Sequence, residues 1–237
     1  VFCGIRRGRF TTEMWERFSF YGMKALLLLY LTKYHLFSDA NGLEVLGSYA
    51  ALVYATPVLG GLLADRYLGM RKAVVFGGLL LVLGHLGMAF EGEQARRTGE
   101  TVIRDEGALQ TFYFSLALIV IGVGFLKPNI STIVGKLYSA EDPRRDAGFT
   151  IFYMGINLGA FSAMLLCGYL GETYGWRYGF GLAGIGMLGG LITFLRGQKY
   201  LHGHAEPKDP ELLTQKSSIG LSKEWTIYLC ALIGVIV

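Results

Sequence analysis

The stretch TTEMWERFSFYGMKALLLLYLT, from Thr11 to Thr32, has the length of a membrane-spanning helix but carries four charged side chains. A charged side chain near the centre of a membrane helix costs about 3 kcal/mol on insertion scales. At about 100° per residue, the charged positions fall on one side of the helix, and they are Glu13, Glu16, Arg17 and Lys24. We therefore expect one face of this helix to contact lipid and the other face to contact water or protein.

The composition of the whole chain indicates an all-α membrane protein. Of its 237 residues, 52% are hydrophobic and 17% are charged, whereas soluble domains average about 25% charged residues. The 34 glycines are about twice the usual share, and small residues let helices in lipid approach closely. The three cysteines and four histidines are spaced like neither a metal site nor a disulfide framework. The net charge of +4 is distributed along the chain, which argues against a nucleic-acid-binding surface.

Hydropathy predicts six complete membrane spans and the start of a seventh. The expected limits are 13–36, 47–65, 73–91, 109–138, 147–171 and 176–196, and the seventh span opens near 224. The predicted domains are a six-helix transmembrane bundle at 1–196, a polar cytoplasmic linker at 197–223, and the truncated start of a further transmembrane helix at 224–237. The chain has no initiating methionine and stops within an apolar run, so we interpret it as a segment of a longer protein.

The basic residues are unevenly divided between the two sets of connecting loops. Most of the 22 lysines and arginines lie on the same side as the N-terminus, and the opposite loops hold Lys33, Arg96, Arg97, Arg104 and Arg177. Because loops rich in lysine and arginine stay in the cytoplasm, we expect the N-terminus to be cytoplasmic.

One lysine lies near the middle of the fourth predicted span. Lys127 is followed by Pro128 in the stretch GVGFLKPNISTIVG. A lysine at that depth is expected to be paired or neutral, and Glu13 and Glu16 are the suitable partners. We predict an interhelical network that joins both glutamates and Arg17 to Lys127, either as a structural ion pair or as part of a polar pathway.

Polar side chains also occur in the second and fifth predicted spans. Tyr153 and Asn157 are four residues apart, and hence on one face of the fifth span. Tyr54 and Pro57 give the second span a polar group and a bend. Together with the buried basic residues, these side chains predict a cavity for an anionic or zwitterionic solute.

The stretch GLLADRYLGMRKA joins the second and third spans on the cytoplasmic side. Asp65 is expected to cap the incoming helix and to pair with Arg71 or Lys72, and Gly69 allows the chain to reverse. The stretch is interpreted either as a gate latch or as a cytoplasmic anchor. Its candidate residues are Gly61, Asp65, Arg66, Gly69, Arg71 and Lys72.

The sequence shows no pattern typical of an enzyme. It contains no Ser-His-Asp arrangement, no paired catalytic carboxylates and no phosphate-binding loop. The stretches GFGLAG and GIGMLG in the sixth span fit a dinucleotide-binding pattern, but no strand precedes them, so we interpret their glycines as helix-packing residues.

Four motifs carry a resemblance to a known family. EMWERFSFYGM resembles the E-x-x-E-R-F-x-Y-Y-G motif of proton-coupled oligopeptide transporters, a branch of the major facilitator superfamily. FYMGINLGAF is similar to the F-Y-x-x-I-N-x-G signature of that family, and GFLKPNIS and ADRYLGMRK match its fourth span and its cytoplasmic loop. The motifs occur in the expected order over nearly the whole chain. The resemblance implies the N-terminal six-helix bundle of a major facilitator fold, located in a plasma membrane, most simply the bacterial inner membrane.

The resemblance also implies a function. It predicts a symporter that imports di- and tripeptides by alternating access, with protons as the coupling ion, no other cofactor and no metal, and a C-terminal helix bundle of the same protein as the partner. Arg17, Lys24 and Lys127 would receive the peptide carboxylate. The implied proton-coupling residues are Glu13, Glu16, Arg17 and Lys127, and the implied substrate-binding residues are Arg17, Tyr21, Lys24, Tyr54, Lys127, Tyr153 and Asn157.

Three positions depart from the family pattern. Phe20 replaces a tyrosine, Lys24 stands where arginine is common, and Gly47 stands where animal members have histidine. A proton-coupled carrier of nitrate or another small anion on the same fold is the alternative function, and a non-transporting membrane receptor is a further one. The Glu-x-x-Glu-Arg set favours proton coupling, and Tyr153 with Asn157 favours a peptide substrate.

Overall fold

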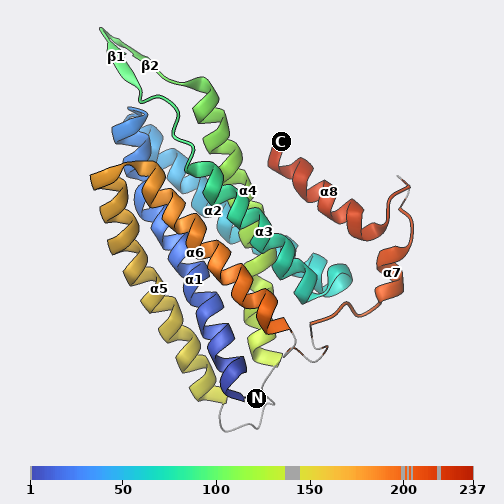
Figure 1. The fold of residues 1–237 in the computed structure, drawn as a ribbon. Helices are drawn as coiled ribbons and strands as arrows, with labels where there is room; N and C mark the ends of the chain where they lie inside the picture. Colours follow the sequence, from blue (N-terminus) through green and yellow to red (C-terminus); the bar gives the residue numbers. More distant parts are fainter. Residues whose placement is uncertain are drawn as a thin grey trace.

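The computed structural model consists of long helices and one short hairpin (Figure 1), and it describes residues 2–136, 145–198, 201, 203, 205–217 and 220–236. The elements are α1 (Phe2–Leu29), η1 (Tyr30–Tyr34), α2 (Asp39–Leu63), η2 (Ala64–Leu68), α3 (Met70–Met88), β1 (Arg96–Thr98), β2 (Thr101–Ile103), α4 (Glu106–Lys136), α5 (Arg145–Tyr174), α6 (Trp176–Gly197), α7 (Pro210–Thr214) and α8 (Lys223–Ile236). The elements η1 and η2 are π-helical turns that extend α1 and α2.

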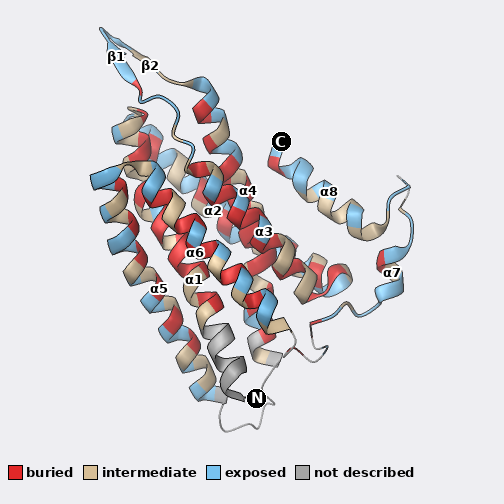
Figure 2. Ribbon diagram, in the orientation of Figure 1, coloured by how far each residue is buried: buried red, intermediate tan, exposed pale blue. Residues whose placement is uncertain are grey.

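The long helices run alternately up and down and form two stacks (Figure 1). In one stack α1 packs against α5 and α6, and in the other α4 packs against α2 and α3. The contact between α3 and α6 joins the stacks. Figure 2 shows that buried positions concentrate where the helices meet, and the largest fully buried side chains include Tyr30, Phe112 and Phe180.

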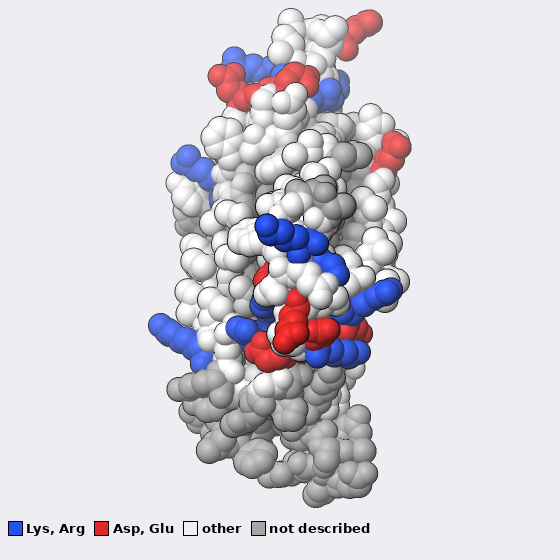
Figure 3. All heavy atoms as spheres, turned by 90° about the vertical axis from the view of Figure 1, so that its right-hand side faces the viewer, with Lys and Arg blue, Asp and Glu red and all other residues white. Residues whose placement is uncertain are grey.

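Several of these helices suit a membrane. Within the described residues, five segments are long and apolar enough to cross one, and they are Asp39–Leu68, Met70–Met88, Glu106–Ile133, Asp146–Tyr174 and Trp176–Gly197. The remaining long helix, α1, carries the charged stripe and lies between α5 and α6. On the face drawn in Figure 3, charged side chains gather mainly at two levels, with largely uncharged surface between them. The chain is therefore a multi-pass membrane protein with the predicted all-α bundle.

The second span begins earlier than the sequence predicts. Hydropathy places its start at 47, but α2 begins at Asp39. The hydroxyl of Ser38 accepts the backbone N–H of Asn41 at 3.2 Å and so caps the helix. The first turns of α2 are polar, so hydropathy does not assign them to the membrane span.

Glycines form the closest helix contacts. Gly60 of α2 lies against the backbone carbonyl of Gly124 in α4, where a Cβ atom would collide. Pro128 has no N–H, so this carbonyl lacks its usual donor four residues later. Gly159 of α5 lies in the same way against the carbonyl of Met14 in α1. The prediction that glycine serves helix packing is confirmed.

The connection between α3 and α4 is anchored by a carboxylate. Strands β1 and β2 form an antiparallel hairpin. Asp105 lies between this hairpin and α4, immediately before the first residue of the helix. The Asp105 carboxylate accepts the backbone N–H groups of Ala108 at 3.0 Å and Glu93 at 3.1 Å. These hydrogen bonds lower the pKa of Asp105.

Candidate functional site

Arg17 forms ion pairs with both glutamates of its own helix. Its Nη2 donates a hydrogen bond to Glu16 Oε1 at 2.8 Å, and its Nε contacts Glu16 Oε2. The same Nε lies 3.3 Å from Glu13 Oε1, because residues four apart lie one turn apart on a helix. Only 4% of Glu13, 1% of Glu16 and 7% of Arg17 is exposed. We call these three residues the α1 triad.

The charges of the α1 triad do not balance when both carboxylates are ionised. Two negative charges then face one guanidinium, and an uncompensated buried charge is costly. Glu16 uses both oxygens to bind Arg17, whereas Glu13 Oε2 is buried and has no hydrogen-bond partner among the described residues. A proton on this oxygen would neutralise the triad without displacing a hydrogen bond. The arrangement is therefore chemically suited to take up and release a proton.

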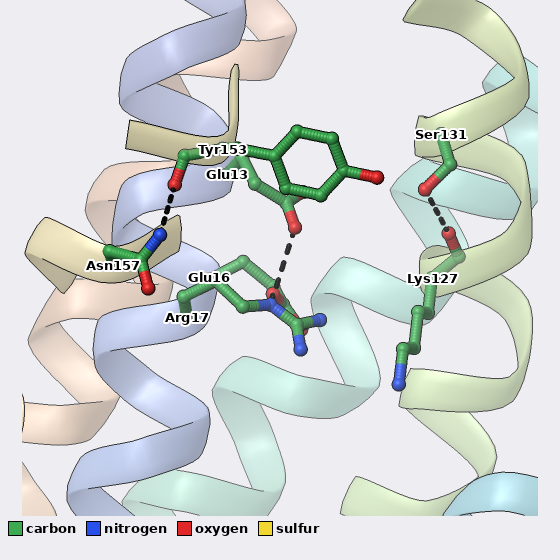
Figure 4. Close-up of polar contacts among 7 residues, drawn as sticks. All are labelled: Glu13, Glu16, Arg17, Lys127, Ser131, Tyr153 and Asn157. Carbon is green, nitrogen blue, oxygen red and sulfur yellow. Dashed lines mark hydrogen bonds and ion pairs between the residues drawn. The ribbon is translucent and has the colours of Figure 1, made fainter. Parts of the chain in front are cut away.

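Lys127 lies opposite the α1 triad, on α4 (Figure 4). Its ammonium lies 4.9 Å from the centre of the Tyr54 ring of α2, a cation–π contact. In the described part of the chain it makes no ion pair, although it acts electrostatically on Glu13. The predicted direct pairing of Lys127 with a glutamate is therefore wrong for this structure, because Arg17 already binds both carboxylates.

Two of the predicted substrate-binding side chains lie together on α5. The Asn157 amide donates a hydrogen bond to the backbone carbonyl of Tyr153 at 2.9 Å, and both side chains are exposed. In Figure 4 the hydroxyl end of the Tyr153 ring points toward α4. Tyr54 is 68% exposed and Tyr153 is 59% exposed. Helices α1, α2, α4 and α5 thus present aromatic hydroxyls, an amide and an ammonium around a buried acid–base group.

The α1 helix adds a contact that the sequence did not indicate. The guanidinium carbon of Arg17 lies 5.4 Å from the centre of the Phe20 ring, and Phe20 is buried edge-on against Tyr21. Phe20 thus covers the charged group, where the sequence suggested only the loss of a hydroxyl. The contact could have been predicted from the spacing, because residues three apart lie on the same face of a helix. Lys24, one turn beyond Tyr21, is exposed.

The turn between α2 and α3 differs from its predicted pairing. Arg71 forms an ion pair with Glu206, and Lys72 forms one with Glu224. Asp65 is exposed and, among the described residues, pairs with neither, so that prediction is wrong. The acidic partners come from the linker and α8, which lie far away in the sequence. The other predicted residues of this turn are placed as follows: Gly61 packs toward Pro128, Arg66 lies over the Tyr67 ring, and Gly69 reverses the chain with a φ of 74°.

Within the described ranges, no group of three or more histidine, cysteine, aspartate or glutamate residues is placed to hold a metal ion. The polar groups of the site are the α1 triad, Lys127 and the exposed tyrosines and asparagine. Groups of these types can exchange a proton and can bind a charged solute.

Several known proteins are similar to this chain in sequence and in fold. The sequence profile of the POT family matches residues 71–225. The peptide transporter YePEPT of Yersinia enterocolitica is 40% identical over 224 residues, covering 92% of this chain and 39% of that protein. The di-/tripeptide transporter of Lactococcus lactis is 39% identical over 208 residues, covering 84% and 39% of the two chains. The chain thus spans about two-fifths of the length of these relatives.

Two solved structures of POT transporters are similar to this chain in fold. The crystal structure of a peptide transporter POT in complex with sulfate superimposes with a TM-score of 0.75 at 40% identity, covering 98% of this chain and 44% of that chain. A POT family transporter in complex with 5-aminolevulinic acid gives a TM-score of 0.74 at 31% identity, covering 98% and 45%.

Proposed function

Because the chain belongs to the POT family, we propose that it is the N-terminal half of a proton-coupled symporter that imports di- and tripeptides by alternating access. Residues 1–196 form the transmembrane bundle, 197–223 the cytoplasmic linker, and 224–237 the start of a further transmembrane helix. A second helix bundle completes the transport pathway. The protein lies in a plasma membrane, the inner membrane of a bacterium, with its N-terminus in the cytoplasm, and protons are the coupling ion.

The observation that best supports the proposal is the buried α1 triad facing Lys127. Glu13 Oε2 has no hydrogen-bond partner in the part of the chain that the structure describes, and its protonation removes one of the two charges that hold Arg17. Arg17 then interacts with Glu16 alone, and its guanidinium is easier to move toward a peptide carboxylate. Release of the proton restores the second ion pair. This exchange couples proton movement to carboxylate binding.

The exposed residues around the triad suit the ends of a short peptide. Lys127 lies on the ring face of Tyr54, and its charge has no carboxylate partner in the part of the chain that the structure describes. A peptide carboxylate would supply that partner. Tyr153 and Asn157 offer a hydroxyl and an amide for the peptide backbone. The names of the relatives support a peptide in preference to a nitrate ion.

The test is transport by the complete transporter in proteoliposomes with an inward proton gradient. We expect radiolabelled dialanine to accumulate, a proton ionophore to abolish the accumulation, and excess tripeptide, but not nitrate, to compete. Lys127→Gln should lower uptake strongly, whereas Lys33→Gln, which removes a lysine charge outside the site, should leave uptake near the wild-type level. Folded, correctly inserted protein that does not accumulate dialanine would contradict the proposal. Competition by nitrate would favour the anion carrier.

A further inference from the structure

The turn between α2 and α3 is in contact with the linker that follows α6. The backbone N–H of Arg71 donates a hydrogen bond to the carbonyl of Ala205 at 2.9 Å. Gly69 lies so close to the backbone of Glu206 and Pro207 that a Cβ atom there would collide. A glycine with a positive φ at this position lets the linker reach the turn. The backbone of the linker thus packs directly against the backbone of the turn.

Two ion pairs reinforce this backbone contact. Arg71 Nε lies 2.5 Å from Glu206 Oε1, and Arg71 Nη2 donates to Glu206 Oε2 at 3.0 Å. Lys72 Nζ donates to Glu224 Oε2 at 2.6 Å. The other oxygen of Glu224 accepts the hydroxyl of Tyr228 at 3.1 Å. The two neighbouring basic residues at the start of α3 are therefore each bound by a carboxylate from the linker or from α8.

Apolar side chains also pack between these segments. Leu213 of α7 is 2% exposed and packs with Ala64 and Leu68 of η2. The Tyr228 ring of α8 stacks on Phe76 of α3 with 4.5 Å between ring centres. The side view in Figure 3 shows acidic and basic side chains gathered together at the lower of its two charged levels. We call the contacts of residues 205–217 and 220–228 with residues 64–76 the linker clamp.

The clamp includes the turn between α2 and α3, whose sequence predicts either a gate latch or a cytoplasmic anchor. Arg71 and Lys72 are partly accessible, so water competes for them and their ion pairs break more easily than those of the buried α1 triad. A turn whose charges are held by the linker is not available to pair with a second bundle. Any movement of the turn must either carry the linker along or release it.

We propose that Glu206 and Glu224 are positioning residues of the cytoplasmic gate. They hold Arg71 and Lys72, and through them they set the position of the turn between α2 and α3. The inference goes beyond the proposed function, because it concerns how the linker controls the gate and does not depend on which solute is carried.

A distance measurement tests the clamp without any transport. Nitroxide labels are placed at the exposed residues Arg196 and Glu211, in a background in which the native cysteines are replaced by alanine. We expect one narrow distance distribution in the otherwise unchanged protein. Lys72→Glu should broaden it, because Glu224 then faces a like charge, and the double exchange Lys72→Glu with Glu224→Lys should restore it.

A matched control is available at the opposite end of the bundle. Lys33 Nζ lies 2.7 Å from Glu172 Oε2 in an exposed ion pair. Reversal of Lys33 or of both members of this pair should leave the distance distribution unchanged. An unchanged distribution in Lys72→Glu, or a double exchange that fails to restore it, would overturn the clamp.

Initial rates of dialanine uptake then test the role in gating. Surface and partly exposed pairs are worth up to about a 5-fold change in an equilibrium. We expect Lys72→Glu to change kcat by about 2- to 5-fold with little change in KM, and the double exchange to reverse the effect. A broadened distribution with unchanged kcat would show a linker that is attached but has no part in the gate, and so would overturn the positioning role. Because the distance measurement needs no uptake, failure of the clamp is distinguishable from failure of the proposed transport.

Discussion

The two glutamates of the α1 triad should respond differently to the same isosteric change. Glu13→Gln and Glu16→Gln each replace one carboxylate by a neutral amide of nearly equal size. Arg17 makes two contacts with Glu16 but only one with Glu13, at 3.3 Å, and the other oxygen of Glu13 has no hydrogen-bond partner among the residues that the structure describes. The structure therefore predicts that Glu16 fixes Arg17 and that Glu13 exchanges the proton.

The expected magnitudes follow from these contacts. A hydrogen bond to a charged group contributes about 1.5–3 kcal/mol and a neutral one about 0.5–1.5 kcal/mol. In Glu16→Gln the amide oxygen can still accept a weaker hydrogen bond from Arg17, but the amide NH₂ replaces the second acceptor and faces the guanidinium, which is also a donor. We therefore expect a loss of about 2–3 kcal/mol in the free energy of unfolding. Glu13→Gln weakens one long contact but also removes the unbalanced negative charge. Its cost should be at most about 1 kcal/mol.

Two assays check this difference. Denaturant unfolding in detergent should show Glu16→Gln to be the less stable variant. In proteoliposomes, Glu13→Gln should still exchange dialanine across the membrane without a gradient but should no longer concentrate it when a proton gradient is imposed. The reasoning is refuted if Glu13→Gln is the less stable of the two, or if it concentrates dialanine as the wild type does.

Three further substitutions test other parts of the structure. Gly60→Val should lower the free energy of unfolding by about 1–3 kcal/mol through overpacking. Gly47→Val, on the same helix, should not, because no described atom lies within 4 Å of a Cβ added there; denaturant titration of both variants measures the difference. The pKa of Asp105 is lower in the folded chain than in the unfolded one, so its carboxylate stabilises the fold above about pH 4 and this contribution is lost as the pH falls through the folded value. Asp105→Asn should therefore lower Tm at pH 7 and reduce the further loss of Tm on acidification, and equal acid sensitivity in both proteins would contradict this. Tyr54→Ala should raise the KM for dialanine by about 2- to 5-fold, since it removes an exposed cation–π partner of Lys127 worth about 0.5–1 kcal/mol, while Tyr54→Phe, which keeps the ring, should change the KM little.

The features that could be predicted from the sequence are those fixed by local spacing. The apolar runs predict the helices, and the spacing of Glu13, Glu16 and Arg17 predicts one polar face of α1. The glycine excess predicts close helix packing, which Gly60 and Gly159 confirm. Each of these depends on residues within one helix or on composition, so no knowledge of the tertiary structure is required.

The partners of the charged residues could not be predicted in this way. Lys127 faces Tyr54, and the basic residues after Gly69 bind carboxylates more than a hundred positions later. The sequence shows which charges need a partner but not which partner the fold brings near. Hydropathy does not predict the early start of α2, because the first turns of this helix are polar and are capped by Ser38.

The two groups of paired charges in this chain, the α1 triad and the linker clamp, differ in burial, and burial suits each of them to its proposed role. The α1 triad is almost inaccessible to solvent. Uptake or release of one proton therefore changes a charge that water does not screen, and the electrostatic energy of the neighbouring polar groups changes with it. The linker clamp is partly accessible, so its ion pairs are weak, screened by salt and easily broken. A gate needs contacts that open at low cost, whereas a coupling site needs charges that cannot be neutralised by solvent. The proposed proton exchange inside the bundle and the proposed reversible closure at its edge thus use the same residue types, glutamate with arginine or lysine, and differ in burial.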